Sequence, residues 1–227
     1  MKKLLLLLLA LTILVSGFAV AEQNNAAAGE MAYETSVLSF EIDPNDGSPR
    51  YNAIVEVKNT GDVAINLGYT SFAVTDAENR LVAIEESSAI YALPSVVYPG
   101  EVGYYFTAGI ELPSDLDMNQ QYNLVYDTDY IRIADTEGVN DYEVINVSFP
   151  DNDYMNIIGE VVNGSDTGDV DVLCICYDEN GKIVTIGGTL EELKTSHNTY
   201  FNIINYAAWG KENIASYSVN ARTRSYN

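Results

Sequence analysis

One strand-and-turn pattern occurs twice in this chain of 227 residues, and it limits the possible fold more than any other feature. Residues 54–82 and 157–184 each run as an apolar segment, a turn that begins at Asn, a second apolar segment that ends at Asp, an acidic turn and a third apolar segment. A two-residue gap aligns them, and the matched positions are Glu56 with Glu160, Asn59 with Asn163, Asp76 with Asp178, and Leu81-Val82 with Ile183-Val184. Short apolar segments separated by turn residues are typical of strands, so the pattern predicts a tandem duplication of one β-rich module.

The acidic turn predicts a β-hairpin in both copies. In the second copy, Asp178-Glu179-Asn180-Gly181 separates two apolar segments, and Gly accepts the positive φ that such a turn needs. In the first copy, Asn79 stands at the position of Gly181. Asn tolerates the left-handed region better than other non-glycine residues, so this substitution preserves the backbone requirement.

The segment before the second turn carries the only two cysteines of the chain, Cys174 and Cys176. Side chains two residues apart on a strand share a face, and Phe72 and Val74 occupy the matching positions in the first copy. We therefore expect both cysteines to point into a core as free thiols. Neighbours on one strand face are poorly aimed for a disulfide, and a redox or metal role is the alternative.

The same segments resemble a known family. Phe72-Ala73-Val74-Thr75-Asp76 and Cys174-Ile175-Cys176-Tyr177-Asp178 are similar to a bacterial domain named for a Phe-x-Leu-Tyr-Asp signature, and Gly159-Glu160-Val161-Val162-Asn163 is similar to the strand that precedes it there. The resemblance covers about thirty residues per copy. It implies a small immunoglobulin-like β-sandwich found in extracytoplasmic proteins, and it supplies no catalytic residue.

The beginning of the chain reads as an export signal. Lys2 and Lys3 precede an apolar run, and the small-x-small sequence Ala19-Val20-Ala21 precedes Glu22, which predicts a signal peptide over residues 1–21 that is cleaved after Ala21. We expect a flexible tether over 22–30, a first sandwich over 31–134, a linker over 135–140 and a second sandwich over 141–227. No later segment is long and apolar enough to span a membrane.

The fold class expected from these patterns is all-β, with two tandem immunoglobulin-like β-sandwich domains after the signal peptide. Many short alternating segments and regular turns support it, and no helix-period pattern lasts long enough for a βαβ unit. One local exception is residues 189–194, Thr-Leu-Glu-Glu-Leu-Lys, which favour a single helical turn.

The charge of the chain restricts its partners. With 33 acidic and 11 basic residues the net charge is −22, which argues against binding nucleic acid or anionic lipid. Solubility outside the cell explains such a charge, and the alternatives are divalent-cation binding or attraction to a basic partner. The acidic turns supply calcium candidates, namely Asp43, Asp46, Asp166, Asp169 and Asp171, although neither turn has the full EF-hand spacing.

Aromatic residues supply the candidates for a binding face. The chain has 17 tyrosines and one tryptophan, and Trp209, Tyr104 and Tyr105 are the positions that we single out for stacking on a sugar or peptide. Packing inside the sandwiches is the alternative reading of all three. His197, the single histidine, is expected at the surface.

These observations predict an exported, non-enzymatic binding or scaffolding protein of the bacterial envelope, without a cofactor. Its expected partner is an envelope protein or polysaccharide. Two alternatives remain. A secreted hydrolase would need two acidic residues converging in a cleft between the modules, one of them with a raised pKa. A calcium-dependent adhesin would need the acidic turns to gather around an ion.

Overall fold

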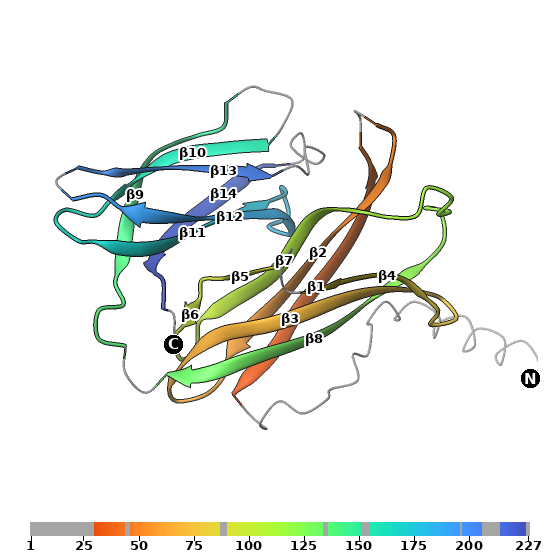
Figure 1. Cartoon of the computed structure of the whole chain (residues 1–227), viewed down its shortest axis with the longest axis horizontal. Helices are drawn as coiled ribbons and strands as arrows, with labels where there is room; N and C mark the ends of the chain where they lie inside the picture. Colours follow the sequence, from red (N-terminus) through yellow and green to blue (C-terminus); the bar gives the residue numbers. More distant parts are fainter. Residues whose placement is uncertain are drawn as a thin grey trace, which may run out of the picture.

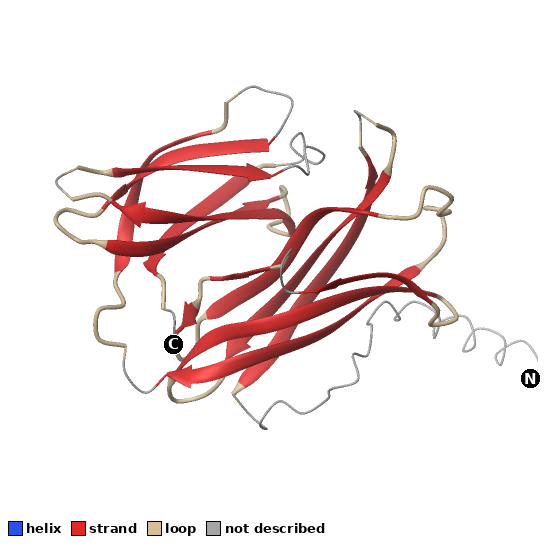
Figure 2. Cartoon of the chain, in the orientation of Figure 1, coloured by secondary structure: helices blue, strands red, loops and turns tan. Residues whose placement is uncertain are grey.

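The structure is a computed structural model that describes residues 30–43, 46–86, 90–133, 136–150, 155–195, 197–205 and 214–225. It is all-β, with strands in antiparallel sheets and no helix among these residues, as the alternating sequence predicts (Figure 2). The predicted signal peptide, the tether up to residue 29 and Trp209 lie outside the described residues. In the part of the chain that is described, no helix has the length and apolar character needed to cross a bilayer.

Strands β1 to β8, which we call the N-terminal half, form two facing sheets. One has the order β1-β2-β7-β5, and the other joins β4-β3-β6, with β8 also paired to β3. The bounds are β1 Met31–Ile42, β2 Pro49–Asn59, β3 Ala64–Asp76, β4 Leu81–Glu86, β5 Tyr91–Leu93, β6 Val96–Val97, β7 Val102–Glu111 and β8 Tyr122–Ile133.

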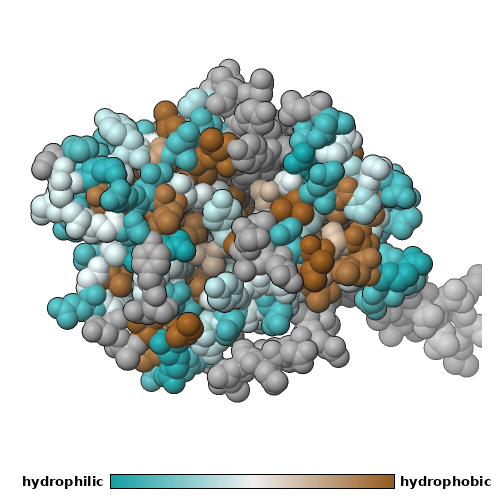
Figure 3. All heavy atoms as spheres, viewed as in Figure 1, coloured by the Kyte–Doolittle hydropathy of each residue, from teal (hydrophilic) through white to brown (hydrophobic). Residues whose placement is uncertain are grey.

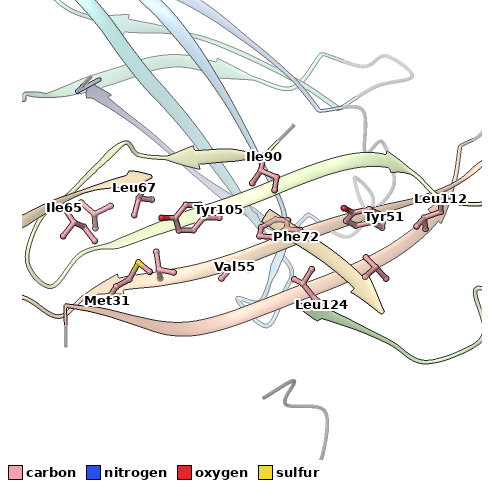
Figure 4. Packing of buried hydrophobic residues seen from close by; sticks show 14 residues of the cluster. Met31, Tyr51, Val55, Ile65, Leu67, Phe72, Ile90, Tyr105, Leu112 and Leu124 are labelled. Atoms are coloured by element: carbon pink, nitrogen blue, oxygen red, sulfur yellow. The ribbon is translucent and has the colours of Figure 1, made fainter. Parts of the chain in front are cut away.

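The core of this half lies between its two sheets. Tyr51 and Val55 of β2 and Tyr105 of β7 point from one sheet toward Phe72 of β3 in the other, and all four side chains are fully buried (Figure 4). Period-two alternation puts the remaining residues of β2 and β7 on the outer face of the same sheet.

Strands β9 to β14, which we call the C-terminal half, follow the order β12-β11-β14-β9-β10-β13. Their bounds are β9 Asp141–Ser148, β10 Met155–Val162, β11 Gly168–Tyr177, β12 Ile183–Leu193, β13 Thr199–Asn205 and β14 Ser216–Thr223. Because β9 pairs with both β14 and β10, the sheet folds over on itself, and the side chains of β10 and β13 pack on those of β11 and β14.

The two halves connect their strands in the same way. In the N-terminal half β3 pairs with β4 and β8 while β2 pairs with β1 and β7, and in the C-terminal half β11 pairs with β12 and β14 while β10 pairs with β9 and β13. The first hairpin has a register shift between Val74 and Thr75, and the second has one between Cys176 and Tyr177.

The matched polar residues of the repeat have matched roles. One carboxylate oxygen of Asp76 accepts from the amides of Glu78 and Arg80, and one of Asp178 accepts from those of Asn180 and Lys182. The predicted positive φ occurs at Asn79 (60°) and at Gly181 (76°).

A second matched pair lies in the core. Asn59 and Asn163 are both buried, and each donates to two backbone carbonyls that lie in different loops or strands, Val63 and Val97 for Asn59 and Asp166 and Lys194 for Asn163.

The expected helical turn at 189–194 is wrong. Residues up to Leu193 continue β12, with Leu190 opposite Asp171 and Leu193 opposite Gly168 in β11. The ladder with β11 supplies backbone hydrogen bonds that a single isolated helical turn cannot match, since helix nucleation is costly.

Candidate functional site at the seam between the halves

The two halves pack against each other through an apolar cluster, and we call this contact zone the seam. From the N-terminal half it includes Ile54, Leu93, Tyr104 and Phe106, and from the C-terminal half Leu173, Ile175 and Ile186. These residues come from β2, β5, β7, β11 and β12, and β5 and β7 lie beside β11 in Figure 1. The cluster explains why β11 is apolar on both faces: one face belongs to the core of the C-terminal half and the other to the seam.

A glycine permits the sheets to approach closely here. A Cβ atom added at Gly188 of β12 would collide with the end of Leu93 and would lie 3.2 Å from Phe106 Cζ. The seam therefore depends on the absence of a side chain at this position.

Arg222 of β14 ties the halves together beside this cluster. Its guanidinium makes five hydrogen bonds, to Oδ1 (2.6 Å) and Oδ2 (3.0 Å) of Asp141, to Oε1 (3.2 Å) and Oε2 (2.7 Å) of Glu101, and to the carbonyl oxygen of Val96 (2.8 Å). Its carbon Cζ also lies 4.7 Å from the ring centroid of Tyr98. A guanidinium has five N–H donors, and five bonds use them all. Although burial disfavours the cation, the hydrogen bonds that Arg222 donates to Asp141 and Glu101 raise its pKa.

A second polar tie is formed by Asp171, the outward-facing acid of β11. Its carboxylate accepts from the amide of Ser95 (2.8 Å) and from Nη1 of Arg224 (3.0 Å), and its side chain is fully buried. Burial raises the pKa of Asp171, and the bonds from Ser95 and Arg224 oppose that rise. The tie continues along the chain after β14, where the amide of Ser225 donates to Ser95 Oγ and the Ser225 carbonyl accepts from Asn66.

A cleft with a volume of about 390 Å³ opens at the seam next to Arg222, and we call it the seam cleft. Its volume lies within the range of small-ligand sites, which favour interfaces between structural units. It is lined by Pro94, Gly100, Glu101, Val102, Tyr104, Asp141, Asp171, Leu173, Ile175, Tyr177, Ser218, Asn220 and Arg222. The outer faces of β11 and β14 form one side, and β7 with the turn before it forms the other.

A second cavity, of about 610 Å³, is lined by residues of β1, by the β11–β12 turn with the start of β12, and by the two residues that precede β14. Its lining is Val37, Ser39, Asp178, Glu179, Asn180, Lys182, Ile183, Val184, Ile214 and Ala215. Val37 and Ser39 belong to the N-terminal half and the other lining residues to the C-terminal half, so this cavity, like the seam cleft, lies between the halves.

The predicted aromatic candidates for a binding face differ in their surroundings. Tyr105 is fully buried in the core of the N-terminal half, where its hydroxyl donates to the carbonyl of Asp129, so its ring is not available for stacking. Tyr104 is 7% exposed and lines the seam cleft, with its hydroxyl bonded to Glu56. Trp209 lies outside the described residues, and exposed His197 lines neither cavity.

The acids that a hydrolase would need do meet in the seam cleft, but they are engaged. Glu101 and Asp141 share Arg222, and Asp171, the one with the raised pKa, has a side chain with no exposed surface. A general acid must reach the substrate proton directly or through one water, which this burial prevents.

The calcium candidates are not brought together. Asp43 and Asp46 both pair with Nη2 of Arg50, at 3.0 and 3.3 Å. Asp166 accepts from the hydroxyl of Tyr142, and Asp171 is held in the seam. Among the residues that the structure describes, no group of three or more acidic, histidine or cysteine side chains could hold a metal.

The two cysteines lie where the alternation predicts. Both are fully buried free thiols in the core of the C-terminal half, with 3.9 Å between their sulfur atoms. The hydrogen bond with Cys176, together with burial, raises the pKa of Cys174, so its reactive thiolate form is disfavoured.

No family model matches the chain, and no curated protein matches it. The resemblance to the Phe-x-Leu-Tyr-Asp domain therefore stays a prediction.

Sequence reasoning missed Arg222, Glu101 and Asp141. One signal was available: the chain has few cations, and Arg222 alternates with Val219 and Ala221, which places it on the strand face opposite their core face.

Proposed function

We propose that the chain is an exported, non-enzymatic binding or scaffolding protein of the bacterial envelope, and that it holds its ligand along the seam. The observation that carries this proposal is the way the halves are joined. An apolar cluster, the Arg222 tie and the Asp171 tie fix one half against the other, and two cavities follow the joint. A joint fixed in this way supplies a preorganised site, which reduces the entropy lost on binding.

We further propose that the halves are tandem copies of one immunoglobulin-like module. The equivalent turns at Asp76 and Asp178, the equivalent buried Asn59 and Asn163, and the common strand pairing support this proposal. Loops at the ends of such sandwiches commonly carry binding residues, whereas here the wall between the copies does so.

The acids of the seam favour binding over hydrolysis. Glu101 and Asp141 accept hydrogen bonds from Arg222, and Asp171 is fully buried. Glu101 and Asp171 therefore anchor one half to the other, and Asp141 holds the Arg222 guanidinium from within the C-terminal half.

The test is co-sedimentation of the protein spanning residues 22–227 with cell envelope from the producing organism at physiological salt. Asn220→Trp fills the seam cleft from an exposed strand position, and Asn202→Trp places the same side chain on exposed β13, outside both cavities. We expect saturable retention of wild type and Asn202→Trp and loss of retention in Asn220→Trp. Equal retention of both variants would exclude the seam cleft as the site, and no retention of wild type would refute envelope binding.

A further inference from the structure

The charges that line the seam cleft compensate one another. Arg222 has given all five donors to Asp141, Glu101 and the Val96 carbonyl, so none is left for an anionic ligand. Asp171 is held by Ser95 and Arg224. A cation would have to compete with guanidinium groups that already occupy these carboxylates. The cleft therefore favours a ligand without formal charge.

The cleft nevertheless offers many hydrogen-bonding atoms. Both oxygens of Asp141 and Oε1 of Glu101 keep a lone pair beyond the bond to Arg222, whereas Oε2 of Glu101 also accepts from the amide of Tyr98. The side chains of Glu101 and Asp141 are 43% and 66% exposed. Asn220 contributes an exposed carboxamide, and the hydroxyls of Ser218 and Tyr177 lie 3.5 Å apart on the same side. A ligand with several hydroxyl groups, each able to donate and accept, matches this mixture.

Apolar atoms line the remainder of the cleft. Val102 and Tyr104 come from β7, and Leu173 and Ile175 from β11. On the face of the molecule that Figure 3 shows, apolar side chains form separate patches among hydrophilic ones. Carboxylates fixed by ion pairs beside an apolar wall suit a pyranose ring, which has hydroxyls at its edge and C–H groups on its faces.

We propose that the seam cleft binds an uncharged saccharide, with Glu101, Asp141 and Asn220 as hydrogen-bonding residues and Tyr104, Leu173 and Ile175 as the wall against the ring. This inference rests on the proposed binding function and names its ligand class.

The experiment titrates the protein spanning residues 22–227 with N-acetylglucosamine tetramer, glucose tetramer, the cationic glucosamine tetramer and the anionic galacturonate tetramer. Methyl NMR signals of Val102, Leu173 and Ile175 report on the cleft. We expect a neutral tetramer to shift these signals and the charged ones to bind at least about tenfold more weakly. Asn220→Ala should weaken binding about two- to tenfold, as for one lost hydrogen bond, and Asn202→Ala should leave it unchanged.

The outcomes separate the ligand class from the function. Tighter binding of a charged tetramer, or neutral binding that Asn220→Ala leaves intact in a normally folded variant, would overturn the inference. No response to any tetramer by a protein that still co-sediments with envelope would overturn the saccharide and leave the binding function standing. If no tetramer binds and the protein does not co-sediment with envelope, both the saccharide inference and the proposed binding function are refuted.

Discussion

Replacing Arg222 by Leu tests whether the seam is a fixed joint. Leu keeps part of the apolar stem but removes all five hydrogen bonds. The largest expected loss is at the Val96 carbonyl, because Val96 is fully buried and an unpaired buried acceptor costs about 1–3 kcal/mol. Loss of the cation–π contact between Arg222 and the ring of Tyr98 adds about 0.5–1 kcal/mol to the destabilisation.

The two carboxylates contribute less to this total. With side chains 43% and 66% exposed, Glu101 and Asp141 regain water when the guanidinium is removed, so each pair is worth about 1 kcal/mol at most. The expected destabilisation is about 3 kcal/mol, and for a chain of this size each kcal/mol lowers Tm by about 2–4 °C.

The assay is urea and thermal unfolding of wild type, Arg222→Leu and Arg222→Lys, with Arg132→Leu as the matched control. Arg132 also pairs with two acids, Glu30 and Asp62, but its side chain is 58% exposed, so its loss should cost about 1 kcal/mol or less. The unfolding free energy of Arg222→Lys should lie between those of wild type and Arg222→Leu, because an ammonium group cannot reproduce the planar fork of a guanidinium. If Arg222→Leu and Arg132→Leu unfold at the same urea concentration, the seam does not depend on Arg222 and our reasoning is wrong.

Three further predictions concern pH, packing and processing. Burial raises the pKa of Glu41 to about 8 from 4.5, against the opposing effects of Asn52 and Arg50 and with a small contribution from Asp43. The folded chain then keeps a proton that the unfolded chain loses, so the unfolding free energy should fall between pH 4.5 and 8 by up to about 1.4 kcal/mol per pH unit, a few kcal/mol in all. Urea titrations at pH 5 and 9 should show this fall for wild type and not for Glu41→Gln. An equal fall in both proteins would contradict the prediction. Gly188→Val should destabilise by about 1–3 kcal/mol through its collision with Leu93, and unchanged melting would show that the seam opens freely. Mass spectrometry of the exported protein should find Glu22 at the N-terminus, and an intact Met1 would refute the signal peptide.

Local features of the sequence were sufficient for the strands and turns. Alternation placed Cys174 and Cys176 in a core, and the exchange of Gly181 for Asn79 identified two turns with the same positive φ. These predictions succeed because strand periodicity and turn conformation depend on residues within a few positions of each other. The helical turn at 189–194 failed for the opposite reason, since pairing with β11 decided its conformation.

The seam was beyond local reasoning because its partners are distant in the chain. Leu173 and Ile175 meet Leu93 and Phe106 across the two halves, and no pattern within either segment specifies that contact. An apolar run that is continuous along β11 does indicate burial on both faces. It does not say which surface covers the second face, so Tyr104 was identified as a binding candidate for its aromatic ring and not for its place in the cleft wall.

Burial of β11 on both faces also connects stability with the proposed function. A sandwich that bound ligands on an open outer sheet face would have polar side chains along it, whereas β11 has Leu173 and Ile175 in the middle of this face and polar side chains on either side of them, at Asp171 and Tyr177. Most of the other polar groups of the cleft come from β14 and the turn before β7. The apolar contact therefore closes the centre of the joint, and the cleft forms where Ser218, Asn220 and Arg222 extend past it. Residues that hold the halves together and residues that face a ligand are neighbours on the same strands. A change that loosens the joint should for this reason weaken binding even where it touches no cleft atom. Gly188 lies outside the cleft lining, so weaker ligand binding by Gly188→Val would show that binding depends on the joint itself.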